Sequence, residues 1–216
     1  MNFTRNEHIR PIVLIDIDGV CVKWQSGLPY YMAKHNIPTN NALKTMISEE
    51  FLSAEELFGM DEEVAFTFLK DYNKSKFIKY LSPYDDALVM INEMKEYWDF
   101  VAVTALGTDK ETVMNRAFNL NALFPGAFKD ILVCGAGEPK DNILMKAKDK
   151  HNNIVMFIDD LGINIDSAER VLPNVPRYHV CRGPRAKAKS DCFEVTNLNE
   201  VRLHYLSKIR PQMFTA

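Results

Sequence analysis

The chain has 216 residues, 47% of them hydrophobic and 25% charged, which is enough to bury one good-sized core with a smaller appended subdomain. A formal net charge of -3 excludes the broad basic field that extended nucleic-acid binding usually needs, although it leaves room for a local basic patch. No apolar run approaches the roughly 20 residues of a membrane helix, and the segment before Pro11 lacks the apolar middle of a secretory signal peptide. We therefore expect a cytoplasmic protein with no membrane partner.

The cysteines do not form a recognisable metal or disulfide pattern. Cys21, Cys134, Cys181 and Cys192 include no CxxC pair and have no histidine partners at zinc-ligand spacing. We expect them to be small buried side chains or free thiols.

Five short apolar runs predict the strands of a parallel sheet. The first, PIVLID, begins at Pro11 and is too short for a helix and too uniformly apolar for a half-exposed strand. Four similar runs follow, at 100–104, 131–134, 154–159 and 178–181.

Segments with helical periodicity separate these runs. Ser82 with Asp85 predicts a capping box at the start of one helix, Thr108 with Glu111 predicts the start of another, and residues 140–150 form a third. One face of the first helix carries four apolar residues: Ala87, Ile91, Met94 and Trp98. The alternation predicts an α/β fold, with a Rossmann-like three-layer core in which helices cover both faces of a parallel sheet. Ligands of such sheets gather at the carboxyl ends of the strands.

The stretch from about Gln25 to Leu81 interrupts the alternation. It has helical start signals, including Ser53 with Glu56, but no convincing strand, so we interpret it as a helical insertion. Its apolar residues are expected to form the core of a small bundle: Phe51, Leu57, Phe58, Val64, Phe68, Leu69 and Tyr72.

Two carboxylates, Asp16 and Asp18, stand two residues apart where the first apolar run ends, and Gly19 begins a turn there. Acids so close repel each other, which favours a bound cation or one protonated carboxyl group. Such a pair supplies one nucleophile and one proton shuttle. A pair of acids that caps a loop would give the same pattern.

The stretch VLIDIDGV resembles the first motif of the haloacid dehalogenase (HAD) superfamily, whose phosphatases use the first Asp as nucleophile and the second as acid/base. Three later family motifs occur in the expected order. Thr104 ends an apolar run, Lys140 lies near a helix start, and Asp159 and Asp160 follow another apolar run. Lys146 and Lys148 compete with Lys140 but are expected on the solvated face of their helix.

The resemblance covers the chain from Pro11 to about Cys181 and implies a Mg2+-dependent phosphatase. Asp16 would form an aspartyl-phosphate, while Asp18 protonates the leaving oxygen and then activates the water. The phosphate would be bound by Thr104, Ala105 and Lys140. Oxygen-only ligation suits magnesium. The expected ligands are Asp16, the backbone carbonyl of Asp18, and Asp159 or Asp160. Asn164 would either support these ligands or stabilise a turn.

In this family the position of residues 25–81 is that of a C1 cap, which leaves 1–24 and 82–216 as the catalytic core. A lid of this kind favours small, enclosable substrates. The stretch DIDGVCVKWQSGL more weakly resembles the 5'(3')-deoxyribonucleotidases. We therefore expect a nucleoside monophosphate or another small phosphometabolite, with Trp24 as a candidate for base stacking. Tyr30 and Tyr31 are further candidates, and all three aromatic residues could equally belong to the core of the cap.

Several alternatives remain open at this stage. The basic segment 182–189 could reach a substrate phosphate or the end of a polynucleotide, or it could be a solvated loop. The same site would serve a polynucleotide 3'-phosphatase or a phosphotransferase, and the fold would also serve a non-catalytic binding module. A dehalogenase proper is disfavoured, because it needs neither Asp18 nor the pair Asp159 and Asp160. The oligomeric state and the pathway are not predicted.

Overall fold

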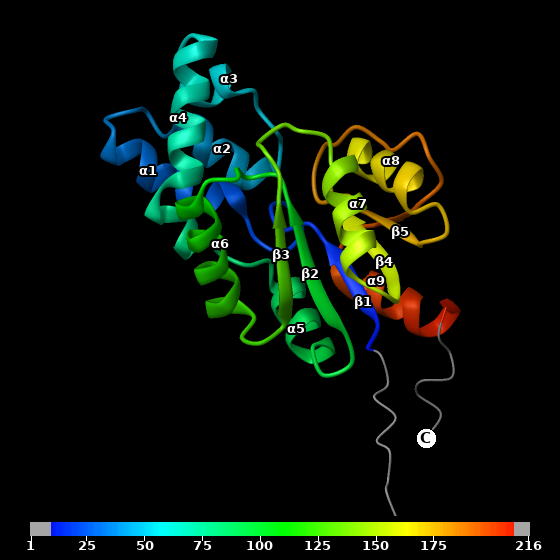
Figure 1. Cartoon of the computed structure of the whole chain (residues 1–216). Coiled ribbons are helices and arrows are strands. Elements are labelled where there is room, and N and C mark those ends of the chain that lie inside the picture. The colour runs from blue at the N-terminus through cyan, green and yellow to red at the C-terminus, as the bar shows by residue number, and fades with distance from the viewer. Residues whose placement is uncertain (1–9, 210–216) are drawn as a thin grey trace, which may run out of the picture.

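The computed structural model describes residues 10–209, which form a six-stranded parallel sheet flanked by helices (Figure 1). The strand order is β3-β2-β1-β4-β5-β6, and each neighbouring pair is parallel. This confirms the predicted α/β core. The two ends of the expected catalytic core, 1–9 and 210–216, lie outside the described residues.

Five strands coincide with the predicted apolar runs, and a sixth was missed. The predicted strands are β1 (Ile12–Ile15), β2 (Asp99–Thr104), β3 (Phe128–Val133), β4 (Ile154–Asp159) and β5 (Arg177–Val180). The missed strand, β6 (Phe193–Val195), is three residues long and lies at the sheet edge with two of its residues exposed, so it lacks a buried apolar run.

Strand β1 lies in the middle of the sheet, and its residues alternate between two hydrophobic layers. Val13 and Ile15 belong to one cluster of buried residues, while Ile12 and Leu14 belong to the other. From β1 the chain builds β2 and β3 on one side and then returns to add β4 on the other. Such a reversal of strand order is where parallel sheets bind ligands.

The helices of the core divide between these two layers. Residues of α5 (Asp85–Met94), α6 (Lys110–Leu123) and α9 (Leu198–His204) pack in the first cluster, and those of α7 (Asp141–Lys150) and α8 (Gly162–Val171) in the second. A π-helical turn, η3 (Tyr205–Ile209), follows α9. The sheet is therefore covered by helices on both faces, as its uniformly buried central strands require.

Two of the predicted helix caps were wrong. The N-cap of helix α5 is Tyr84, which makes no side-chain hydrogen bond to the helix. Ser82 lies ahead of the helix, where its backbone is hydrogen-bonded to Lys23 and Ser26. Helix α6 is capped by Asp109, whose side chain accepts a hydrogen bond from the backbone N–H of Thr112.

The chain between β1 and α5 is helical, and no strand lies in it. It contains η1 (Trp24–Gly27), α1 (Leu28–Lys34), α2 (Asn40–Ser48), α3 (Ala54–Phe58), α4 (Glu62–Lys74) and η2 (Lys76–Tyr80). In Figure 1, α1–α4, drawn in blue and cyan, group beyond one end of the sheet. The expected capping box of Ser53 and Glu56 is present at the start of α3. No helix among residues 10–209 is long and apolar enough to cross a membrane.

The expected bundle core within this helical segment was only partly right. Leu57, Phe58 and Tyr72 are buried, but Phe51 is 57% exposed and Val64 is 46% exposed. Phe51 precedes α3 and lies at a cavity described below, whereas Val64 belongs to a solvent-facing part of α4. The four cysteines are free thiols, two buried and two partly buried.

Asp86 joins α5 to the chain that follows β5. Arg182 donates hydrogen bonds of 3.0 and 2.7 Å to its two oxygens, and the backbone N–H of Leu198 donates one of 2.7 Å. Burial alone would raise the pKa of Asp86, but these hydrogen bonds outweigh burial and hold the pKa below its usual range.

We expect Asp86→Asn to lower the free energy of unfolding by about 1.5–3 kcal/mol at pH 7, because Arg182 loses its charged partner. Because the folded pKa is depressed, this loss should be full above about pH 3.9, the unfolded value, and should vanish as pH falls through the folded pKa. Urea unfolding across pH measures it. Asp85→Asn, an exposed acid in the same helical turn, is the control, and an equal loss in both variants would contradict the expectation.

Candidate functional site

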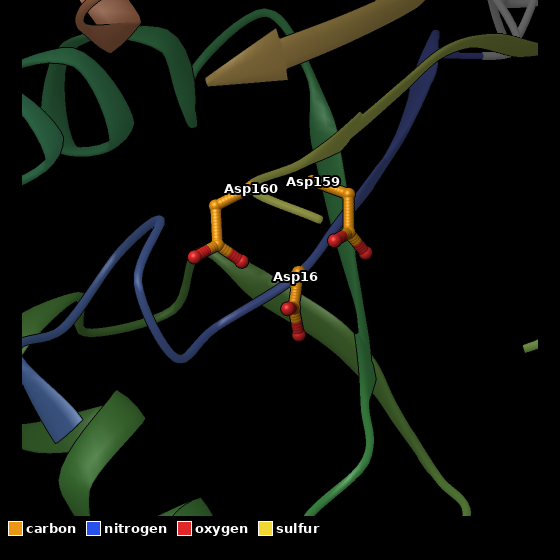
Figure 2. A group of neighbouring side chains, drawn as sticks. All are labelled: Asp16, Asp159 and Asp160. Carbon is orange, nitrogen blue, oxygen red and sulfur yellow. The ribbon is translucent and has the colours of Figure 1, made fainter. Parts of the chain in front are cut away.

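The candidate site lies at the carboxyl ends of three neighbouring strands. Asp16 directly follows β1, Thr104 ends β2 and Asp159 ends β4. Because these strands are parallel and adjacent, residues from distant parts of the sequence meet at one edge. Figure 2 shows the carboxylates of Asp16, Asp159 and Asp160 gathered there.

Lys140 connects two of these strand ends. From the N-cap of α7, its Nζ lies 2.9 Å from Asp16 Oδ1, 2.8 Å from Asp159 Oδ2 and 2.8 Å from the carbonyl oxygen of Val103. Burial opposes the charge, but attraction by Asp159 and Asp16 outweighs it and raises the pKa of Lys140. The side chain is therefore a fixed cation beside Asp16. Lys146 and Lys148 are exposed on the same helix, away from the site.

Three buried acids form a cluster that could hold a metal ion. Asp16, Asp159 and Asp160 each offer an oxygen, and these oxygens lie within 4.8 Å of one another. Within the described part of the chain, the cations that contact them are Lys140 and Arg185, so three carboxylates face two positive charges. Burial raises the pKa of Asp16 further than Lys140 lowers it, and burial together with Asp159 raises the pKa of Asp160 to about 7. This surplus of negative charge fits a divalent cation with oxygen ligands.

The two adjacent acids have different surroundings. Asp159 Oδ1 accepts hydrogen bonds from the backbone N–H of Leu161 at 2.9 Å and from Asn164 Nδ2 at 3.0 Å, while Oδ2 accepts one from Lys140. Asn164 thus supports Asp159, one of the two roles expected for it. Both oxygens of Asp159 are therefore engaged in hydrogen bonds, whereas Asp16 and Asp160 line the cavity where an ion could bind.

Asp160 lies against the turn after β1 and is paired with Arg185. A side chain at Gly19, whose φ is +81°, would come within 2.2 Å of Asp160 Oδ2, so only glycine fits there. Arg185 Nε donates to Asp160 Oδ2 at 3.1 Å, and its Nη1 donates to the carbonyl oxygen of Glu49. The guanidinium also lies 4.5 Å from the ring centre of Phe51. At 6% exposure of its side chain, Arg185 is not part of a solvated loop.

The hydroxyl group of Thr104 is buried beside the cavity. The residue is fully buried, and its Oγ1 has no hydrogen-bond partner among residues 10–209. Buried hydroxyl groups are nearly always paired, and this one borders the cavity above Asp16, next to Ala105. A bound oxyanion would satisfy it.

Asp18 does not join the acid cluster. Both of its oxygens accept hydrogen bonds from Nη2 of Arg116, at 2.5 and 2.7 Å. Arg116 was missed by the sequence analysis. The available signal was its spacing of four residues from Thr112 and Leu120, which places a charged residue on the buried face of α6.

A cavity of about 420 Å³ lies over these residues and continues towards the helical segment. Trp24 lines it, and its Nε1 donates to Asn73 Oδ1 at 2.9 Å. Tyr30 and Tyr31 do not line it: Tyr30 is 69% exposed, and Tyr31 is buried against Tyr72. The outer wall is otherwise largely apolar and includes Phe51, Leu52, Leu57 and Leu69.

Solved structures with a similar fold come from HAD proteins. A haloacid dehalogenase-like hydrolase from Streptococcus pneumoniae is 15% identical, with a TM-score of 0.63 over 90% of this chain and 98% of that one. YfnB from Bacillus subtilis, named as a HAD-hydrolase and bound to magnesium, is 17% identical, with a TM-score of 0.62 over 91% and 98%. L-2-haloacid dehalogenase from Xanthobacter autotrophicus, with chloropropionic acid covalently bound, is 12% identical, with a TM-score of 0.62 over 93% and 100%. The chain has the HAD fold.

No protein-family model matches the chain. A relative exists in Enterobacteria phage T4, where it is described as an uncharacterized 32.4 kDa protein in the Gp30-rIII intergenic region. The two sequences are 47% identical over 193 residues, which are 89% of this chain and 69% of the phage protein. The chain therefore belongs to the family of this phage T4 protein.

Proposed function

We propose that the protein is a Mg2+-dependent phosphomonoester hydrolase that acts through an aspartyl-phosphate on Asp16. The observation that carries the proposal is the surroundings of Asp16, where a buried Lys140 and the unpartnered hydroxyl of Thr104 share one cavity with its carboxylate. A carboxylate nucleophile with a fixed cation and a free donor beside it is suited to an anionic phosphate ester.

The hydrogen bonds of Asp16 select the attacking oxygen. Oδ1 accepts from Lys140 Nζ at 2.9 Å and from the backbone N–H of Ile17 at 2.7 Å. Oδ2 therefore keeps its lone pairs for attack on phosphorus. The hydroxyl of Thr104 and the backbone at Ala105 would hold the phosphate oxygens in line, while Lys140 offsets their charge.

Asp16 and Asp160, with the backbone carbonyl of Asp18, would hold the magnesium ion. When bound, the ion would offset the negative charge of the carboxylates and of the phosphate. Asp159 then serves chiefly to orient Lys140.

Asp18 is the proposed acid/base. It lines the cavity two residues after Asp16, where it would give a proton to the leaving oxygen as the bond to phosphorus breaks. The same carboxylate would then take a proton from the water that attacks the aspartyl-phosphate, which releases phosphate and restores Asp16.

We further propose that residues 25–81 act as a C1 cap on a core of 1–24 and 82–216, and that they select the leaving group. The outer wall of the cavity contains apolar side chains together with Glu49, Glu50 and Glu138. Among residues 10–209, those that line it form no basic row that would follow a polynucleotide backbone. A compact monoester fits best, and a nucleoside monophosphate with its base near Trp24 is the leading candidate.

The test is phosphate release from nucleoside monophosphates, sugar phosphates and 3'-phosphorylated oligonucleotides, each with Mg2+ and with a chelator. We expect release that depends on Mg2+ and is greatest for nucleoside monophosphates. Preference for oligonucleotide ends would instead favour the polynucleotide 3'-phosphatase, and phosphate passed to a sugar hydroxyl would identify a phosphotransferase. Chloride release from 2-chloropropionate without a metal would favour a dehalogenase. A folded protein that acts on none of these substrates would favour a binding module.

A further inference from the structure

A buried ion pair joins the proposed acid/base, Asp18, to helix α6. Arg116, in the middle of α6, is 0% exposed, and its Nη2 contacts both oxygens of Asp18 at 2.5 and 2.7 Å. The side chain of Asp18 is 18% exposed. The pair spans 98 positions of the sequence, so only the fold brings it together.

Among residues 10–209, Asp18 is the acidic side chain that pairs with the guanidinium of Arg116. Its Nη1 lies 3.5 Å from Asn119 Oδ1, and its Nε has no hydrogen-bond partner among residues 10–209. A buried guanidinium without a counter-ion is strongly unfavourable. The pairing with Arg116 therefore fixes the position of the Asp18 carboxylate.

The face of α6 that carries Arg116 is itself anchored. Asn115 Nδ2 donates to the carbonyl oxygens of Lys74 and Ser75, at 2.7 and 3.2 Å. Asn119 Nδ2 donates to the carbonyl oxygens of Lys79 and Leu81, at 3.3 and 3.1 Å. These four carbonyl groups belong to the last part of the helical segment, from the end of α4 to Leu81. The guanidinium thus projects from a platform that is bonded on both sides of it.

We propose that Arg116 is a positioning residue, which holds the carboxylate of Asp18 in place for the proton transfers of the proposed hydrolysis. This inference rests on the proposed function. Arg116 does not line the cavity, so it acts through Asp18 and makes no contact with the substrate. Loss of Arg116 should therefore slow turnover and leave substrate binding unchanged.

The first test compares Arg116→Met with Met114→Ala. The second variant truncates a side chain of the same helix that is 59% exposed, and it leaves the pair with Asp18 and the anchors of α6 intact. With a nucleoside monophosphate, we expect Arg116→Met to lower kcat by about 100-fold, the lower end of the range for general acid–base catalysis, with KM changed less than about twofold. Arg116→Lys should restore part of kcat, because its ammonium keeps the positive charge but is carried on a more flexible side chain. Met114→Ala should keep kcat.

A double-mutant cycle separates positioning from a general loss of order. In the background of Asp18→Asn, Arg116→Met should cause almost no further loss of kcat. The reason is that Arg116 acts on turnover through the Asp18 carboxylate, which Asp18→Asn has already removed. An undiminished second loss, a parallel rise in KM, or an equal loss of kcat in Met114→Ala would overturn the inference.

Crystal structures of the wild type and Arg116→Met provide a readout that does not depend on activity. The inference requires the Asp18 carboxylate to move in the variant, and an unmoved carboxylate would overturn it. If Arg116→Met does not fold, Arg116→Lys replaces it in both tests. A wild-type protein that hydrolyses no phosphate ester would refute the proposed function, while the crystal structures would still decide whether Arg116 positions Asp18.

Discussion

Asp16→Asn is expected to lower phosphate release by at least about 10^4-fold, because the amide nitrogen replaces the oxygen that attacks phosphorus. The retained Oδ1 can still accept the hydrogen bonds from Lys140 and Ile17. The fold should therefore survive, and the loss of one charge relieves repulsion among the buried acids. Phosphate release measures the effect, and a thermal melt checks the fold.

The intermediate gives a second measurement for the same variant. Acid quenching of the wild type during turnover should trap one phosphoryl group on the peptide that contains Asp16, and the variant should trap none. Asp149→Asn, an exposed acid at the end of α7, is the control and should behave as the wild type does. Turnover that persists in Asp16→Asn, or a phosphoryl group on another peptide, would assign the nucleophile elsewhere.

Lys140→Met is expected to have the next largest effect, on activity and on stability together. Without the ammonium group, Asp16 and Asp159 face each other with no cation between them, at sites that are almost completely buried. We expect turnover to fall by about 10^2–10^3-fold, the usual effect of removing one electrostatic donor. The free energy of unfolding without Mg2+ should fall by about 3–5 kcal/mol, as for other buried ion pairs that lose one partner.

Mg2+ should stabilise Lys140→Met more than it stabilises the wild type, because the ion then meets a larger surplus of negative charge. Urea unfolding with and without Mg2+ measures this difference. Lys146→Met, on the exposed face of the same helix, is the matched control and should change neither turnover nor stability. An identical response to Mg2+ in Lys140→Met and the wild type would argue against a metal site at these acids.

Much of the fold was predictable because buried parallel strands have a distinctive sequence pattern. Each of the strands β1, β2 and β4 is an apolar run that ends at or just before a polar residue, so the sequence indicated both the strand and the position of its candidate side chain. Ligands of a parallel sheet bind at the carboxyl ends of its strands, and the HAD motifs include the same residues, so Asp16, Thr104 and Asp159 could be expected to meet. The short edge strand β6 has no such pattern and was missed.

The sequence by itself determined the α/β class, the strand ends that carry Asp16, Thr104 and Asp159, and the lysine beside them. Only the tertiary structure decided that Arg116 is paired with Asp18 and Arg185 with Asp160. Those pairs follow from how α6 and the chain after β5 pack against the sheet. Local periodicity and motif spacing report which residues are buried along one element, whereas a contact between charged side chains on different elements depends on the packing of the whole chain.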